Sequence, residues 1–343
     1  MTQPFSSAAS DVGGLRPLAA DAASALTAAP GGEPLIEARD LRKRFGDFTA
    51  VDGIDVQVRR GEAFGFLGPN GAGKSSTMRM IGCISPPTSG VLRVLGRDPA
   101  SHGAAIRARL GVVPQQDSLD GELTVLDNLV VYARYFGYSR QESNARARRL
   151  LEFASLTDRA DSLVEPLSGG MKRRLTIARS LVNDPEILLL DEPTTGLDPQ
   201  ARHVLWDRLF RLKRQGVTLV LTTHYMDEAE QLCDRLVVMD HGRIVAEGSP
   251  RQLIDTWSSR EVLELRFADD DLTPHAERLE RAVSRGEAKR VEVLPDRLLV
   301  YADDGEAASA SAHAAGLRPL SSLVRRSSLE DVFLRLTGRT LVD

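Results

Sequence analysis

The sequence contains few cysteines and no long apolar run. Of its 343 residues only two are cysteines, Cys83 and Cys233, too few and too isolated for a disulfide framework or a cysteine metal site. We expect both to be buried thiols in a reducing compartment. The apolar runs are short, such as 187–190 and 219–221, whereas a membrane-spanning helix needs roughly 18 or more consecutive apolar residues. If a substrate crosses a membrane, a separate chain must carry it.

A strong charge bias and a secretory leader are also lacking. The net charge of -4 gives no general electrostatic reason to expect binding to nucleic acid or to an anionic membrane surface. Residues 1–33 are rich in Ala, Ser, Gly and Pro without sustained periodicity, so we predict a disordered leader. Because this segment has neither a basic start nor an apolar core, we expect no signal peptide and a cytoplasmic chain.

One segment carries recognisable chemistry. The run G-P-N-G-A-G-K-S at 68–75 matches the phosphate-loop pattern G-x-x-x-x-G-K-[ST]. Its glycines let the backbone turn N–H groups toward phosphates, Lys74 reaches the outer phosphates, and the Ser75 hydroxyl can ligate Mg²⁺. A short apolar strand at 63–67 and a helix predicted at 75–84 supply the required strand-loop-helix context. The nucleotide-binding candidates here are Gly68, Pro69, Asn70, Gly71, Ala72, Gly73, Lys74, Ser75 and Ser76.

Two later motifs follow in a fixed order. The run L-S-G-G-M lies at 167–171 and I-L-L-L-D-E at 187–192. Together with the phosphate loop they resemble the ATP-binding cassette family, whose signature loop separates the phosphate loop from the Walker B strand. The resemblance implies ATP hydrolysis with Mg²⁺ as cofactor. Met171 stands where the family signature most commonly has Gln, but the phosphate-facing part of the signature is intact. That part comprises Ser168, Gly169 and Gly170.

The signature loop precedes a predicted helix. Ser168 can cap this helix, and the positive N-terminal end of the helix would then face the γ-phosphate of ATP on a second subunit. A capped helix without that role is the structural alternative. The basic run 172–174 is predicted to be solvated or to face an interface rather than to bind ATP.

The candidate catalytic residues follow from the same comparison. Asp191 ends a strongly apolar strand, where a carboxylate is costly unless it serves an ion, and Mg²⁺ is the natural partner. By resemblance, Glu192 is the general base and Gln115 contacts Mg²⁺ and the attacking water, with Gln116 as the alternative register. His224 corresponds to the switch histidine that contacts the γ-phosphate. The metal candidates are Ser75, Gln115 and Asp191.

Two further positions match family motifs. Asp198 follows P-T-T-G-L and corresponds to the D-loop aspartate, expected at a dimer seam. Phe45 falls where the family usually has a Tyr that stacks on adenine, and its ring can still stack, although a core position would also suit it. Because one cassette carries half of each composite site, the resemblance implies a head-to-tail dimer. The simplest case is a homodimer, and a paralogue is the alternative.

We predict an α/β fold of two domains. An ABC-type P-loop NTPase at 34–252 would combine a mostly parallel sheet, an antiparallel β subdomain and a helical subdomain at about 117–166. A small C-terminal α+β appendage would occupy 255–343. The appendage is predicted to contain a strand at 261–267, a helix at 274–284, a hairpin formed by 290–294 and 297–301, and a final helix at 328–336.

The tail points to a subfamily. The run S-S-L-E-D-V-F-L-R-L-T-G at 327–338 looks like the tail of cassette ATPases from daunorubicin-type drug exporters and nodulation-type lipo-oligosaccharide exporters. The resemblance implies export of an amphipathic drug, lipid or lipo-oligosaccharide through a separate permease, at the cytoplasmic face of the membrane. The alternative is a soluble cassette ATPase that acts on ribosomes or DNA. Structurally, the apolar residues of the last helix could simply pack against the rest of the protein.

Overall fold

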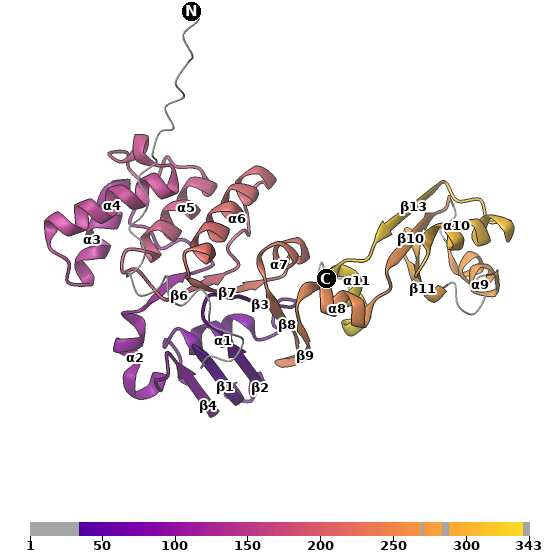
Figure 1. The fold of residues 1–343 in the computed structure, drawn as a ribbon, viewed down its shortest axis with the longest axis horizontal. Coiled ribbons are helices and arrows are strands. Elements are labelled where there is room, and N and C mark those ends of the chain that lie inside the picture. Colours follow the sequence, from indigo (N-terminus) through magenta and orange to yellow (C-terminus); the bar gives the residue numbers. More distant parts are fainter. Residues whose placement is uncertain (1–33, 269–270, 283–287, 339–343) are drawn as a thin grey trace, which may run out of the picture.

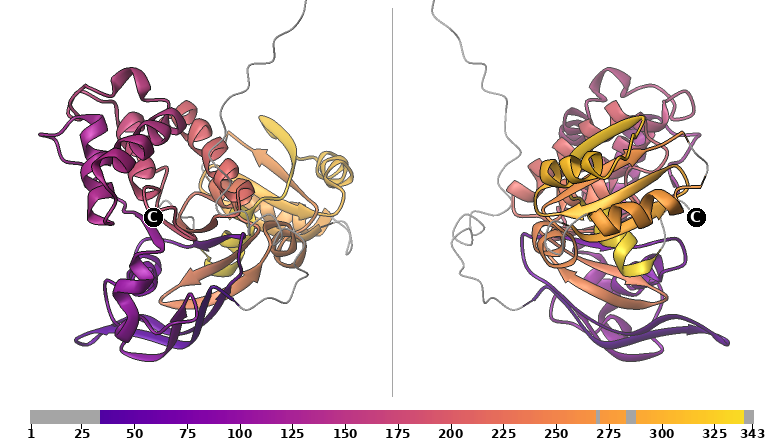
Figure 2. Two further views of the ribbon diagram at one scale, coloured as in Figure 1. Left: turned by 60° about the vertical axis from the view of Figure 1, so that its left-hand side comes forward. Right: turned by 90° about the vertical axis from the view of Figure 1, so that its right-hand side faces the viewer.

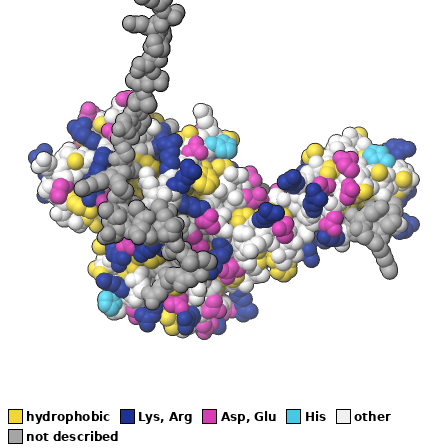
Figure 3. Space-filling view, in the orientation of Figure 1, with side chains coloured by type: hydrophobic (Ala, Val, Ile, Leu, Met, Phe, Trp, Pro, Cys, Tyr) yellow, Lys and Arg dark blue, Asp and Glu magenta, His cyan; other side chains and the backbone are white. Residues whose placement is uncertain are grey.

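The computed structural model describes residues 34–268, 271–282 and 288–338. The leader predicted at 1–33 lies outside these residues. Figure 1 shows a large body, the cassette, from which a smaller C-terminal body, the appendage, extends to one side. Figure 3 shows that on the same face Lys and Arg are interspersed with Asp and Glu.

Within the described ranges, no helix combines the length and the apolar character that a membrane crossing requires.

A six-stranded sheet forms the centre of the cassette. Its strand order is β5-β6-β7-β3-β8-β9, and every neighbouring pair is parallel except β8 and β9. Strands β3 and β7 are buried at every position, as expected for central strands covered on both faces. Parallel pairing brings the carboxyl ends of β3, β6 and β7 to one edge, where ligands bind in open α/β sheets. The strands are β3 (Ala63–Leu67), β5 (Leu110–Val113), β6 (Ile187–Asp191), β7 (Thr218–Thr223), β8 (Arg235–Asp240) and β9 (Arg243–Gly248).

An antiparallel sheet covers one side of this centre. It has the order β2-β1-β4 and shares a buried apolar cluster with helix α1 and the central sheet. Both views in Figure 2 are turned from Figure 1, and the left one shows this indigo sheet below the magenta helices. Helix α1 ends earlier than predicted because Gly82 caps it and Cys83 adopts a φ of 57°. The elements are β1 (Ile36–Phe45), β2 (Phe48–Val58), α1 (Lys74–Ile81), β4 (Ser89–Val94) and α2 (Pro99–Arg107).

Helices pack on the other side. Helix α4 begins with a capping box in which Ser139 and Glu142 satisfy each other's backbone N–H groups. Helix α5 packs against α3 and α4 and leads back to β6, so it joins the helical region to the central sheet. The elements are α3 (Val125–Tyr135), α4 (Arg140–Ala154), the 3₁₀ turn η2 (Thr157–Arg159), α5 (Gly169–Ser180), α6 (Pro199–Arg214) and α7 (Met226–Leu232).

The appendage is a β-α-β-β-α-β unit. Its antiparallel sheet has the order β11-β12-β10-β13, the ferredoxin-like arrangement. The sequence patterns predicted neither α10, which is Ala/Ser-rich and has no broad apolar stripe, nor β13, an edge strand without a buried residue. The elements are α8 (Pro250–Trp257), β10 (Glu261–Arg266), α9 (Thr273–Ala282), β11 (Ala288–Leu294), β12 (Arg297–Ala302), α10 (Gly305–Ala314), β13 (Ser321–Arg326) and α11 (Leu329–Thr337).

The last helix, α11, returns to the cassette. Leu329, Val332 and Phe333 join a buried apolar cluster that also contains Leu232 of α7 and Leu253 of α8. These contacts agree with the structural alternative, in which the apolar residues of the last helix pack against the rest of the protein. Positions 252–255, where the sequence predicted the domain boundary, lie within α8, which begins after a capping box at Ser249 and ends at Trp257.

Candidate active site

The phosphate loop connects β3 to the N-terminus of α1. Gly73, the residue before α1, has a φ of 101°, and a Cβ there would lie 2.4 Å from the Ala50 carbonyl oxygen. At Gly68, a Cβ would lie 2.3 Å from the Met239 carbonyl oxygen. Other residues would be strained or would clash at these positions, so the fold itself requires both glycines. The result is a tight turn with backbone N–H groups at a helix N-terminus, which suits an anion.

Lys74 is buried beneath this loop. Its Nζ donates to the carbonyl oxygens of Gly68 at 2.7 Å and Pro69 at 2.9 Å. Burial lowers the pKa of Lys74, while the nearby carboxylates of Glu192 and Asp191 act in the opposite direction. A cation held in this position can balance negative charge that approaches the loop.

Ser75 and Asp191 meet at the edge of the sheet. The Ser75 hydroxyl donates to Asp191 Oδ1 at 3.1 Å, and the Thr222 hydroxyl donates to the same oxygen at 2.5 Å. Hydroxyl and carboxylate oxygens are the ligand types that Mg²⁺ prefers. In the part of the chain that the structure describes, no group of three or more His, Cys, Asp or Glu side chains could hold a metal by itself. A Mg²⁺ ion here would therefore take its other ligands from phosphate oxygens and water.

Three side chains of the site contact the Glu192 carboxylate. Its Oε2 accepts from Gln115 Nε2 at 2.9 Å and from the Thr195 hydroxyl at 3.2 Å. His224 Nδ1 lies 3.3 Å from the other oxygen, at the outer limit of hydrogen-bond distance. The contact with His224 lowers the pKa of Glu192, burial opposes this shift, and Lys74 adds to it. Glu192 is thus ionised at neutral pH and can accept a proton.

The backbone at Glu192 is strained. Its φ of 45° lies in the left-handed region that non-glycine residues rarely adopt. Its backbone N–H donates to both the carbonyl oxygen of Thr222, at 3.1 Å, and the hydroxyl of the same residue, at 3.0 Å. Such strain is often found at functional sites, where the surrounding structure holds it in place. No residue type in the sequence indicated this conformation.

Arg173 is a site residue that the sequence analysis missed. The prediction that 172–174 form a solvated or interface-facing run is wrong for this middle residue, which is 4% exposed. Its Nη2 donates to the carbonyl oxygens of Asp191 and Glu192, each at 3.0 Å, and its Nη1 contacts the Gln115 carbonyl oxygen at 3.4 Å. The rigid guanidinium therefore fixes helix α5 to both loops that carry the candidate catalytic side chains.

Ser168, predicted to cap a helix, and Asp198, predicted at a dimer seam, both lie on the surface. Ser168 is the N-cap of α5 and accepts from the Met171 N–H at 3.3 Å. Asp198 is the N-cap of α6 and accepts from the Ala201 N–H at 2.8 Å. Both residues and Gly169 are exposed, so a second molecule could reach these helix ends.

The structure also places the remaining candidates, which are Phe45, the two glutamine registers and the two cysteines. Phe45 ends β1 with 51% of its surface exposed, which rules out the alternative of a core position, and Lys43 Nζ lies 4.9 Å from its ring centroid. Of the two glutamine registers, the hydrogen bond to Glu192 favours Gln115 over Gln116. Cys233 is buried as expected, whereas Cys83 is only half-buried.

The geometry of the site identifies the class of protein. A phosphate loop, a buried lysine and the carboxylates of Asp191 and Glu192 meet at the carboxyl ends of the parallel strands β3 and β6, as in P-loop nucleotide hydrolases. Residues 51–195 match the ABC transporter family, and residues 275–338 match the C-terminal domain of the nodulation factor export protein NodI. The chain belongs to the ABC transporter family.

Close relatives span almost the whole chain. The Nod factor export ATP-binding protein I of Burkholderia lata is 48% identical over 308 residues, covering 90% of this chain and 98% of the relative. The protein of the same name from Ralstonia nicotianae is 47% identical over 317 residues, covering 91% and 97%.

Solved structures agree on the cassette. An ATP-binding subunit of an ABC transporter is 31% identical with a TM-score of 0.59, covering 65% of this chain and 92% of that structure. A dimeric cassette in a post-hydrolysis state, bound to ADP and phosphate, is 28% identical with a TM-score of 0.58, covering 62% and 98%. The predicted family, fold class and ATP-hydrolysing activity are confirmed.

Proposed function

We propose that this chain is the ATPase subunit of an exporter that moves a lipo-oligosaccharide or a similar amphipathic molecule through a separate permease. The observation that carries the proposal is the extent of the similarity. Relatives named as Nod factor export ATP-binding proteins match over the appendage as well as the cassette, and 275–338 match the NodI C-terminal domain independently. A generic cassette would share only the first part. The subunit would bind the permease at the cytoplasmic face of the membrane.

The loop side of the site would hold the nucleotide. Backbone N–H groups of 68–76 would surround the phosphates, Lys74 would balance their charge, and the exposed ring of Phe45 would stack on adenine. Ser75 and Asp191, together with Gln115, have the oxygen ligands that suit Mg²⁺. Bound there, Mg²⁺ would neutralise charge that develops on the transferred phosphoryl group.

The opposite side would direct water. Glu192 is ionised, and two donors, Gln115 and Thr195, hold its Oε2 while Oε1 faces His224. In this arrangement the carboxylate can take a proton from an attacking water, and Gln115 can orient the same molecule. His224 would then report whether the γ-phosphate is present, because it lies between Glu192 and the start of α7.

A second cassette would complete each site. The exposed N-terminus of α5, with Ser168, Gly169 and Gly170, would face the γ-phosphate on the partner, and Asp198 would lie at the seam. A homodimer is the simplest assembly, and a heterodimer with a paralogue is the alternative. The dimeric form of a cassette with the same fold supports this geometry.

The proposal is tested by transport. The chain and a candidate permease would be copurified, reconstituted in vesicles, and supplied with ATP and a labelled lipo-oligosaccharide. We expect ATP-dependent accumulation that is absent with Glu192→Gln. Stable association with ribosomes or DNA, without any permease association, would instead support the alternative of a soluble cassette ATPase.

A further inference from the structure

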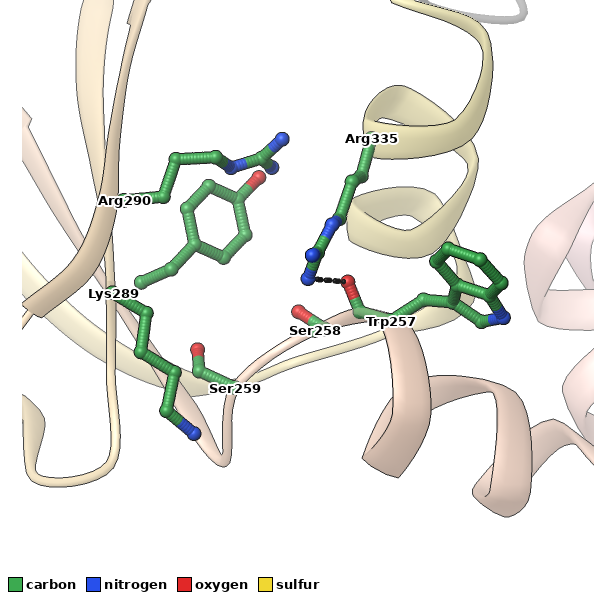
Figure 4. A pocket seen from close by; sticks show the side chains of 7 residues that line it. Trp257, Ser258, Ser259, Lys289, Arg290 and Arg335 are labelled. Atoms are coloured by element: carbon green, nitrogen blue, oxygen red, sulfur yellow. Dashed lines mark hydrogen bonds between the residues drawn. The ribbon is translucent and has the colours of Figure 1, made fainter.

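A cavity lies where the cassette meets the appendage, among residues that the ATP site does not use (Figure 4). We call it the seam cavity. Its volume is ≈ 200 Å³, and its walls come from the end of α8, the linker that follows, β11, β12 and α11. Drug-sized ligands occupy pockets of roughly 300–1,000 Å³, so this cavity suits a smaller molecule.

The seam cavity is lined by three cations and, among the described residues, by no carboxylate. The cations are Lys289 and Arg290 on β11 and Arg335 on α11. Arg335 Nη1 donates to the Trp257 carbonyl oxygen at 2.7 Å, and no ion pair involves Arg335 within the described ranges. The excess of positive charge at the walls favours an anion.

Neighbouring carboxylates neutralise only part of the positive charge at the walls of the seam cavity. Lys289 pairs with Asp303 at 2.6 Å, and Arg290 Nη2 pairs with Glu292 at 2.9 Å. Arg290 also stacks on the Tyr301 ring, 4.1 Å from its centroid, which fixes the plane of the guanidinium. A guanidinium has five N–H donors and an ammonium three, so each cation keeps donors beyond these contacts. A ligand with several acceptor oxygens would accept hydrogen bonds from these remaining donors.

We propose that the seam cavity binds the phosphate group of a small phosphate monoester. Such a group is an anion with three strong acceptor oxygens, which can accept from Arg335, unpaired among the described residues, and from the N–H donors that Arg290 keeps beyond its pair with Glu292. Two guanidinia from different elements give the fork geometry that recognises phosphate. The same chemistry is present in soluble phosphate esters and in the headgroup of phosphatidic acid.

Binding at the seam cavity would act on a helix that touches the cassette. The phosphate would connect Arg290 on β11 to Arg335 on α11. Helix α11 packs against α7, and Glu230 of α7 accepts from the Leu329 N–H at 2.6 Å. Because α7 begins just after His224, the seam cavity is joined to the candidate active site by direct packing.

The chain contains a natural reporter for this test. It has two tryptophans, Trp206 and Trp257, and only the second lines the seam cavity. In the full chain carrying Trp206→Phe, we expect glycerol 3-phosphate or phosphatidic acid in phosphatidylcholine vesicles to change Trp257 emission saturably. The responding arm identifies the source of the phosphate. No saturable change in either arm, or an equal change with chloride at matched ionic strength, would overturn the proposal.

Variants separate this site from the phosphate loop. Arg290→Gln and Arg335→Gln should each weaken binding by about tenfold or more, since each removes charge-assisted hydrogen bonds. Arg290→Lys, which keeps the charge but loses the fork, should fall in between. Arg281→Gln, an exposed cation on α9, is the matched control. If Arg335→Gln fails to fold, the binding affinity of Arg290→Gln alone tests the proposal. Unchanged binding in Arg290→Gln, or loss of the signal in Lys74→Ala, would refute the assignment.

Discussion

The sheets of the cassette and of the appendage differ in how they are covered. In the cassette, two large buried clusters lie on the two faces of the central sheet, and β3 and β7 are buried throughout. In the appendage, α9 and α10 cover one face, while the other face has only a small cluster of Val262, Leu299, Tyr301 and Leu334. The appendage therefore has one complete core and one face that depends on α11.

Helix α11 links the two regions because its apolar residues point to both. Phe333 enters the cassette cluster and Leu334 enters the small cluster of the appendage. Asp331 anchors the helix through two hydrogen bonds from Arg325, at 2.7 and 2.8 Å. The cassette thus carries the chemistry, whereas the appendage contributes a helix to the cassette core. A truncation at 255 would remove this helix and uncover apolar surface next to α7.

The largest expected effect tests the chemistry of the cassette. Glu192→Gln keeps the shape of the side chain but removes the carboxylate that can act as a base. We expect ATP binding to persist and turnover to fall by roughly 10²-fold to 10⁴-fold. Steady-state ATPase rates and nucleotide affinity measure this, with the exposed Glu152→Gln as matched control. Near-normal turnover would assign the water-directing role to another residue.

The second effect tests whether α11 belongs to the cassette core. Phe333 is 1% exposed, so Phe333→Ala should lower the free energy of unfolding of the cassette by about 3–5 kcal/mol. Leu320→Ala, at a residue 74% exposed, should have little effect. In a chain that carries Trp257→Phe, denaturant unfolding followed by Trp206 emission reports the cassette. If only the appendage were destabilised, α11 would not stabilise the cassette.

The cassette and the appendage also differ in how much of their structure the sequence predicted. Binding a phosphate requires glycines, a lysine and a hydroxyl at set spacings, so the loop at 68–75 could be identified residue by residue. The site around Asp191 and Glu192 followed from the same motif order. In the appendage no catalytic motif fixes the spacing of the residues, so its strands and helices were predicted from periodic apolar patterns. Helix α10 and strand β13 lack such patterns and were missed.

Tertiary contacts explain what remained hidden in the cassette. Arg173 looked like its basic neighbours because nothing local distinguishes it. It is buried because carbonyl groups from the Gln115 loop and from the turn at Asp191 and Glu192 converge on it. The positive φ of Glu192 likewise depends on contacts with Thr222, thirty positions along the chain.

A third prediction sharpens the role of this arginine. Arg173→Ala would leave several buried carbonyl groups without donors and should cost about 2–4 kcal/mol of stability. Because the guanidinium holds the Gln115 loop against Glu192, ATPase turnover should fall even at temperatures where the variant is folded. Arg173→Lys, whose ammonium lacks the forked N–H geometry of a guanidinium, should keep only part of the wild-type turnover. The exposed Arg148→Ala is the control, and equal turnover of Arg173→Ala and wild type would reduce Arg173 to a packing residue.

The smallest expected effect concerns pH. The contact with His224 is the largest cause that lowers the pKa of Glu192. A carboxylate with a depressed folded pKa keeps its contribution above its unfolded pKa and loses it as the pH falls through the folded value. His224→Gln removes the contact, so the pKa of Glu192 should rise.

The acid limb of kcat/KM, which reports the free enzyme, should then move to higher pH. This shift is read from the position of the limb, so it is independent of any loss of rate that the histidine variant also causes. His102→Gln, at an exposed histidine outside the site, should leave the limb where it is. An unmoved limb in His224→Gln would show that another group sets the acid dependence of the cassette. A limb that moved equally in His102→Gln would show a general charge effect instead of a local one.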